Sequence, residues 1–240
     1  MAEWVEGPVL GIETSGRLTG LALVSEGRLL AETSVDLAAS TQELLPGMLD
    51  DLLSRHGLRL SALRRIGVSL GPGSFTGLRV GLSWARALAL GADVPLVGIP
   101  SHCALAYAAR SSRAQILLLT GLRRGLVCLE LGRWEEGDIW VPEVPGAPRP
   151  VAEWSQFVCP HLDENSRLIC LGEAVSAAFA MDGALSERAE LPSDVLAEVR
   201  RPAPVAFLAA RPGQIEARGA DLERVELLYL RDADAKRPQS

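Results

Sequence analysis

Lysine is almost absent from this sequence. Of its 24 basic residues only Lys236 is a lysine, and the other 23 are arginines. A Walker-type phosphate loop and a Schiff-base enzyme both need a lysine in the folded body of the protein, so both classes are excluded.

Cysteine pairs and long apolar runs are also lacking. The four cysteines form no Cys-x-x-Cys pair and have no histidine at zinc-finger spacing, which is typical of reduced thiols. No apolar run approaches the roughly 18 residues of a membrane span, and the acidic residues 1–6 do not have the pattern of a signal peptide. We therefore expect a cytoplasmic protein that makes no membrane contact.

Positive charge and aromatic side chains are scarce as well. The net charge is -6 at pH 7, and 5% of the residues are aromatic against 48% hydrophobic. Such a field repels a polyanion, which argues against a protein that binds nucleic acid by itself. The 240 residues suffice for one large domain or for two closely joined halves.

The first third of the chain has a readable order of elements. Residues 9–12, 19–24 and 28–35 are apolar runs separated by turn residues, which predicts an antiparallel meander of three strands. Helices and strands then alternate, at residues 41–56 (helix), 65–70 (strand), 76–90 (helix), 96–99 (strand) and 101–110 (helix). This order predicts an α/β protein with a mixed sheet flanked by helices.

Beyond residue 110 the pattern weakens. Strands are predicted at residues 115–120, 126–131 and 167–171, and a helix at 203–211. Four prolines predict an irregular linker between them: Pro142, Pro145, Pro148 and Pro150. A shorter, degenerate copy of the first half would give a weak pattern of strands and helices of this kind.

A glycine-rich loop, Gly71-Pro72-Gly73-Ser74-Phe75-Thr76-Gly77, separates a predicted strand from a predicted helix. Glycines let the backbone approach a ligand closely, and a helix start offers free amides to an anion. An ordinary strand-to-helix turn with a serine or threonine cap explains the loop equally well. We assign five of its residues to a possible vestigial phosphate loop: Gly71, Gly73, Ser74, Thr76 and Gly77.

A second polar cluster, Glu13-Thr14-Ser15, follows the first predicted strand. A carboxylate beside two hydroxyls would suit magnesium or phosphate, although a turn-forming cluster is the commoner reason for such residues. His102 has no ligand type at i-4 or i+4, where Gly98 and Ala106 stand, so no metal site is expected on that helix.

Four stretches together resemble one known family. They are Gly11-Ile12-Glu13-Thr14-Ser15, Leu44-Leu45-Pro46, the block from Gly71 to Gly81 and Tyr229-Leu230-Arg231. This set resembles the TsaB (YeaZ) family, accessory subunits of bacterial tRNA threonylcarbamoyladenosine synthesis in the glycoprotease-like superfamily. The resemblance implies the actin-like ATPase fold of actin, sugar kinases and Hsp70, with two related halves and the second shortened. The first half would hold residues 1–106 and 201–231 and the second 107–200, followed by a flexible tail at 232–240.

The resemblance also implies a function. By this resemblance the chain would be a non-catalytic subunit that is needed to modify adenosine 37 in tRNAs that read codons beginning with A. The catalytic paralogue has a metal-binding histidine pair where Ser101 and Leu105 stand here, so ATP and a metal ion are expected in that partner and neither is required by this chain. Its other expected partners are an ATPase subunit of the same pathway, tRNA only through the complex, and a second copy of itself when it is alone.

The docking surface is predicted from the helices. The apolar stripe at 41–56 is wider than one sheet face needs, so part of it should be exposed in the monomer. The predicted interface residues are Leu45, Met48, Leu49, Leu52, Leu78 and Leu82. The alternative function is an ATP-dependent kinase or acyl-transfer enzyme of the same fold that acts alone. A metalloprotease is disfavoured, because the histidine pair is missing.

Overall fold

The computed structural model describes residues 4–36, 41–110, 114–136, 139–183, 185, 187–190 and 200–228. It divides into two compact units, Met1–Ala108 with Ser193–Leu227 and Ala109–Pro192 with Leu228–Ser240. The finer boundaries expected from the sequence stay predictions, and the expected tail at 232–240 lies outside the described residues. No described helix combines the length and the apolar character that crossing a membrane requires.

The first unit is built on a five-stranded mixed sheet. Its strand order is β3 (Arg28–Asp36), β2 (Leu18–Ser25), β1 (Pro8–Glu13), β4 (Arg65–Ser69) and β5 (Leu96–Ile99). The pairs β1–β2 and β2–β3 are antiparallel, whereas β1–β4 and β4–β5 are parallel. The predicted meander and the alternation that follows it are confirmed.

The second unit repeats this order. Its strands run β8 (Ile139–Pro150), β7 (Leu126–Glu135), β6 (Gln115–Gly121), β9 (Leu168–Leu171) and β10 (Ala189–Glu190). Here too the first strand in sequence is central, with two antiparallel strands on one side and two parallel strands on the other. The predicted actin-like class, two related α/β halves of which the second is shorter, is confirmed.

One prediction for the second unit is wrong. The four prolines at 142–150 do not form an irregular linker but lie in β8, a twelve-residue strand. β8 is at the edge of its sheet. On the open side of an edge strand no neighbouring strand accepts a hydrogen bond, so a proline, which has no N–H group, is tolerated there. Proline at such an edge also protects it from pairing with another chain.

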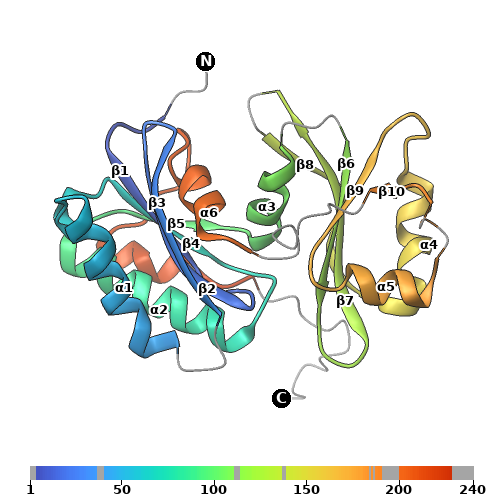
Figure 1. Cartoon of the computed structure of the whole chain (residues 1–240), viewed down its shortest axis with the longest axis horizontal. Helices are drawn as coiled ribbons and strands as arrows, with labels where there is room; N and C mark the ends of the chain where they lie inside the picture. The colour runs from blue at the N-terminus through green and yellow to red at the C-terminus, as the bar shows by residue number, and fades with distance from the viewer. Residues whose placement is uncertain are drawn as a thin grey trace. The chain divides into compact units, whose positions relative to one another are not determined.

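Helices cover both faces of the first sheet (Figure 1). α1 (Thr41–Arg55) and α2 (Phe75–Ala92) lie on one face, over a core that contains Leu10 and Ile12 of β1. α6 (Pro202–Ala209) lies on the opposite face. Because both faces are covered, the central strands are buried along nearly their whole length, as their continuous apolar sequence suggests.

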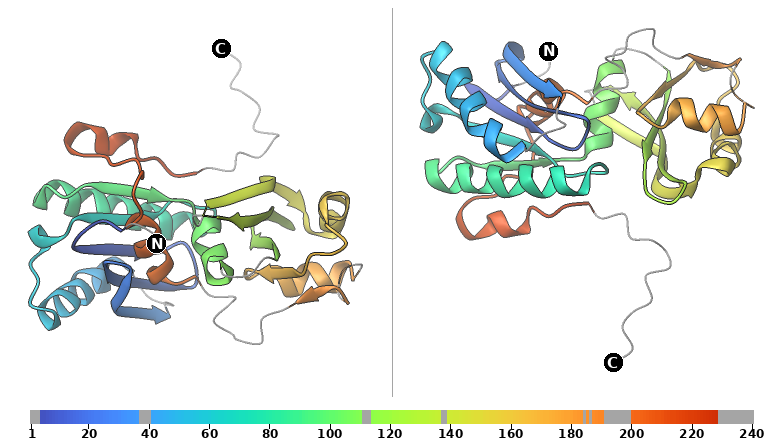
Figure 2. Two further views of the ribbon diagram at one scale, coloured as in Figure 1. Left: turned by 90° about the horizontal axis from the view of Figure 1, so that it is seen from above. Right: turned by 60° about the horizontal axis from the view of Figure 1, so that its bottom comes forward.

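α6 approaches the first sheet unusually closely, and glycines make this possible. A side-chain carbon on Gly11 of β1 would lie 2.5 Å from the Ala206 nitrogen, and one on Gly67 of β4 would lie 2.6 Å from the Ala209 Cβ. The chain after α6 then reaches α2, where Arg86 Nη2 donates to the Val225 carbonyl oxygen at 2.6 Å. Figure 2 shows this segment, with the short helix Gly219–Arg224, alongside α2.

The remaining helices are short. α3 (Ser101–Ala106) follows β5 in the first unit, and α4 (Trp154–Val158) and α5 (Val175–Met181) pack on the second sheet. The core of the second unit centres on Trp154, whose Nε1 donates to the Ala178 carbonyl oxygen at 2.9 Å. Each unit therefore has its own core, as two separate halves require.

Candidate functional site

The glycine-rich loop connects β4 to α2 and is held from both ends. Gly71 has a φ of 111°, a conformation that favours glycine, and a cis peptide bond joins it to Pro72. Its N–H donates to Ser101 Oγ at 2.9 Å, and Ser101 N donates back to its carbonyl oxygen at 2.8 Å. At the other end Ser74 caps α2, because its Oγ accepts from the Gly77 N–H at 3.3 Å.

The predicted Glu13 cluster lies beside this loop. Glu13 is fully buried, and its Oε1 accepts from Ser15 N at 2.5 Å and from Ser69 Oγ at 2.9 Å. The Ser74 N–H donates to the Ser15 carbonyl oxygen at 2.7 Å. The structure thus brings together two predicted groups that are about sixty residues apart in sequence, the β1–β2 turn and the Gly71 loop.

Other residues of the protein fill the space beside most glycines of the loop and of the start of α2. A side-chain carbon on Gly77 would collide with the Thr14 carbonyl oxygen, and one on Gly81 would collide with Thr14 Oγ1. One on Gly73 would collide with the Ser15 carbonyl oxygen. Thr14 and Ser15 are 1% and 2% exposed, whereas Thr76 is exposed. These glycines therefore let the first turn pack tightly against the start of α2.

Arg200 completes the cluster, and nothing in the sequence pattern pointed to it. It is 3% exposed, and its Nη1 donates to Ser15 Oγ at 2.8 Å, to the Ser15 carbonyl oxygen at 3.4 Å and to the Pro72 carbonyl oxygen. One guanidinium group therefore contacts both the first turn and the Gly71 loop. These partners precede it by 185 and 128 residues, so no local spacing could have revealed the link.

The predicted interface residues need a correction. Five of them belong to the core of the monomer at 0–5% exposure: Leu45, Leu49, Leu52, Leu78 and Leu82. Met48 is half-buried and packs against the same core. Part of the 41–56 stripe is exposed, as expected, at Leu44 (39%), but Leu45, Leu49 and Leu52 are covered by the sheet and the neighbouring helix.

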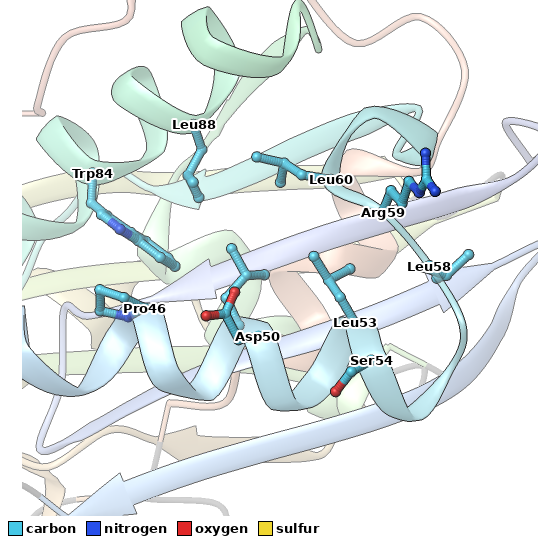
Figure 3. Close-up of a pocket in the computed structure, with 10 residues that line it drawn as sticks. Pro46, Asp50, Leu53, Ser54, Leu58, Arg59, Leu60, Trp84 and Leu88 are labelled. Atoms are coloured by element: carbon cyan, nitrogen blue, oxygen red, sulfur yellow. The ribbon is translucent and has the colours of Figure 1, made fainter.

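A groove nevertheless lies between α1 and α2 (Figure 3). Trp84 and Leu88 of α2 are half-buried, and Trp84 points toward Pro46 of α1. The groove measures about 590 Å³, and its lining residues are Pro46, Leu49, Asp50, Leu53, Ser54, Leu58, Arg59, Leu60, Trp84 and Leu88. Six of these ten side chains are Leu or Trp, so the groove is an apolar surface with a few polar groups at its rim.

Comparison with known proteins supports the family resemblance. A family model described as TsaD, tRNA N6-adenosine threonylcarbamoyltransferase, matches residues 35–141. The tRNA threonylcarbamoyladenosine biosynthesis protein TsaB of Escherichia coli K12 is 31% identical over 134 residues, which are 55% of this chain and 58% of that protein. The TsaB of Bacillus subtilis 168 is 28% identical over 229 residues, 95% of this chain and 96% of that protein. The chain is similar to proteins of the TsaB family.

A solved structure has the same fold. It is that of a Pseudomonas aeruginosa protein described as similar to peptidase YeaZ, with a TM-score of 0.72 and 24% identity, covering 94% of this chain and all of that one. The match thus spans less than two thirds of the E. coli relative but nearly the whole of the B. subtilis relative and of the solved structure. The family resemblance and the glycoprotease-like superfamily inferred from the sequence motifs are confirmed.

The two positions where the catalytic paralogue is expected to hold its metal have other contacts in this TsaB relative. Ser101 is fully buried and bonded to Gly71, and Leu105 is 5% exposed within the first unit. Across the described ranges, no three His, Cys, Asp or Glu side chains are grouped so that they could hold a metal ion. Both positions therefore support the Gly71 loop and the core.

Proposed function

We propose that this chain is a non-catalytic accessory subunit of tRNA threonylcarbamoyladenosine synthesis that docks on and activates the catalytic transferase paralogue. The observation that carries the proposal is the groove between α1 and α2, which lies inside the segment that matches the TsaD family model. The TsaB relatives add the pathway, since their names assign them to the biosynthesis of this modified nucleoside.

The groove has the character of a protein interface. Trp84 and Leu88 are only half-buried in the monomer, and Pro46 at the other wall is exposed. Full burial of an exposed apolar side chain is worth about 1.5–3 kcal/mol, of which a half-buried side chain gains a part, and tryptophan is enriched among the residues that dominate binding energy. The polar rim formed by Asp50, Ser54 and Arg59 can fix the register of a docked helix.

The paralogue is the partner that this surface fits best. The TsaD family model covers residues 35–141, so a protein of that family has counterparts of both helices that flank the groove. Two like helix pairs can pack about an approximate twofold axis, with the ridges of each pair seated in the groove of the other. The same geometry allows two copies of this chain to pair when the paralogue is absent.

The accessory role also agrees with the charge and with the Gly71 loop. A net charge of -6 gives the chain no general attraction for tRNA, so tRNA would bind through the complex. Ser15, Thr14 and Arg200 fill the space beside the loop glycines, so the reacting groups, ATP and the metal ion would be supplied by the partner subunits.

The proposal is tested by titrating the paralogue with the wild-type chain and with Leu88→Glu. A carboxylate at the centre of the groove should weaken binding about 100-fold or more, because it would be desolvated in the interface. The matched control is Leu90→Glu on the same helix, at a side chain that is 67% exposed and does not line the groove. Thermal melts of both variants establish that they fold.

Equal binding by wild type and by a folded Leu88→Glu would place the interface elsewhere. Absence of binding by the wild-type chain itself would overturn the accessory role. Threonylcarbamoyl transfer to tRNA by the isolated chain would overturn the non-catalytic assignment.

A further inference from the structure

Arg200 reaches the loop site from a distant part of the sequence. It immediately precedes α6 and Arg201, and its guanidinium group is inserted between the β1–β2 turn and the Gly71 loop. Within the described residues, its Nη1 donates to three oxygens, namely the carbonyl and hydroxyl of Ser15 and the carbonyl of Pro72. The group is 3% exposed, so solvent does not screen it appreciably.

The Arg200 side chain occupies the space that two glycines provide, with its aliphatic stem beside Gly16 and its guanidinium group beside Gly73. A side-chain carbon on Gly16 would lie 3.2 Å from Arg200 Cδ, and one on Gly73 would lie 2.5 Å from Arg200 Nη1. Glycines in a turn before a helix commonly leave room for the phosphates of a ligand. Here that room is taken by a side chain of the protein itself.

The oxygens around Arg200 are of the kind that bind a hard cation. Carbonyl, hydroxyl and carboxylate oxygens are the ligands of Mg²⁺ and Ca²⁺. Glu13 adds a buried carboxylate that is bonded to Ser15 N, and within the described part of the chain its Oε2 has no hydrogen-bond partner. A buried carboxylate two residues before Ser15 favours a positive charge nearby.

From these contacts we infer that Arg200 is a resident cation, which takes the place of a metal–nucleotide between the β1–β2 turn and the Gly71 loop. The magnesium nucleotide that an actin-like fold implies does not fit here, because the guanidinium fills the gap and uses the same oxygens. Arg200 also ties the segment before α6 to both loops, so the site has a fixed structure without a bound ligand.

The test compares Mn²⁺ binding to the full-length wild-type chain, Arg200→Ala and the double variant Arg200→Ala with Glu13→Gln. Wild type should bind no Mn²⁺ at this place. Arg200→Ala should gain one Mn²⁺ site of millimolar or better affinity, because it exposes the oxygens and leaves the carboxylate. The double variant should lose that site, since a neutral amide replaces the carboxylate.

A second measurement follows hydrogen exchange in wild type at residues 13–16 and 71–77 with and without millimolar Mg-ATP. No protection is expected, and protection of both segments would overturn the inference. A folded Arg200→Ala that gains no Mn²⁺ site would overturn it as well. If Arg200→Ala does not fold, Arg200→Gln replaces it in the titration, with the same two outcomes. None of these results depends on the docking proposal, because all use the chain without a partner.

Discussion

The two units use the same turn after corresponding strands but build different sites on it. In the first unit β4 runs parallel to β1 and is followed by Gly71 with a φ of 111°. In the second unit β9 runs parallel to β6 and is followed by Gly172 with a φ of 114°. The first turn leads into a helix of 18 residues and the second into one of 7. The repeated topology therefore dictates the turn, while the side chains around it decide what the turn can do.

The contacts of the two turns differ in burial. In the first unit the loop meets the opposite hairpin through Ser15 and the 3% exposed Arg200. In the second unit the corresponding side-chain link is an exposed hydrogen bond, from the Gly121 N–H to Glu173 Oε1 at 3.2 Å, beside a backbone bond from the Ala174 N–H to the Leu119 carbonyl oxygen at 3.1 Å. Buried charged contacts hold one geometry, whereas an exposed one contributes little. We therefore expect the first unit to be the more rigid of the two at this turn.

The largest effect is expected from a substitution that destabilises the first unit alone. Gly11→Val should destabilise it by more than about 4 kcal/mol, because the new side chain would collide with the α6 backbone at Ala206 and Pro202. Hydrogen exchange read segment by segment should show fast exchange in β1 and α6 but not in β6.

The control for this change is Gly47→Ala in α1, where no atom lies within 4 Å of the new carbon. It should stabilise the first unit by up to about 1 kcal/mol through helix propensity. If Gly11→Val leaves α6 as protected as in wild type, the close approach of helix and sheet is not what holds the first unit together.

A smaller effect compares a buried arginine in the first unit with an exposed one in the second. Arg65 is 8% exposed and donates to Glu216 Oε1 and to the carbonyl oxygens of Ala209 and Arg211 at the end of α6. Arg65→Met should cost about 3 kcal/mol, because it leaves those buried carbonyls without donors. Arg167→Met should cost much less, since its pair with Glu190 is exposed. Urea unfolding of both variants checks the contrast, and equal losses would contradict it.

The smallest effect concerns pH in the second unit. The hydrogen bond from Arg167 lowers the pKa of Glu190 below its ordinary value of 4.5. A lowered carboxyl pKa gives stability that is present above pH 4.5 and is lost as the pH falls through the folded-state pKa. Glu190→Gln should therefore unfold slightly earlier than wild type at neutral pH, and the gap should close in acid and in high salt. A gap that widens in acid would contradict this assignment.

Local patterns were enough to predict the strands of the first unit. Residues 9–12, 19–24 and 28–35 lie within β1, β2 and β3, because each apolar run is bounded by turn residues. β8 was missed because proline is a strong signal for a linker, and only the place of a strand in the sheet shows that it is an edge.

The site was predictable only in part. The Gly71 loop and the Glu13 cluster were recognised from residue type, but their contact and the role of Arg200 depend on links of long sequence separation. The stripe of the 41–56 helix was read correctly as a helix face, but its exposed leucine is Leu44 and not one of the leucines named for the interface. A sequence does not show how many neighbours cover a face, and here α2 and the sheet cover Leu45, Leu49 and Leu52.

The groove between α1 and α2 is the surface through which we propose that the chain acts. The direct test measures threonylcarbamoyladenosine in tRNA by mass spectrometry, after a reaction that contains the catalytic paralogue, the pathway ATPase subunit and either wild type, Leu88→Glu or Leu90→Glu. We predict full modification with wild type and Leu90→Glu, and a loss to the level without this chain for folded Leu88→Glu. Equal modification with all three, or full modification when the chain is omitted, would contradict the account.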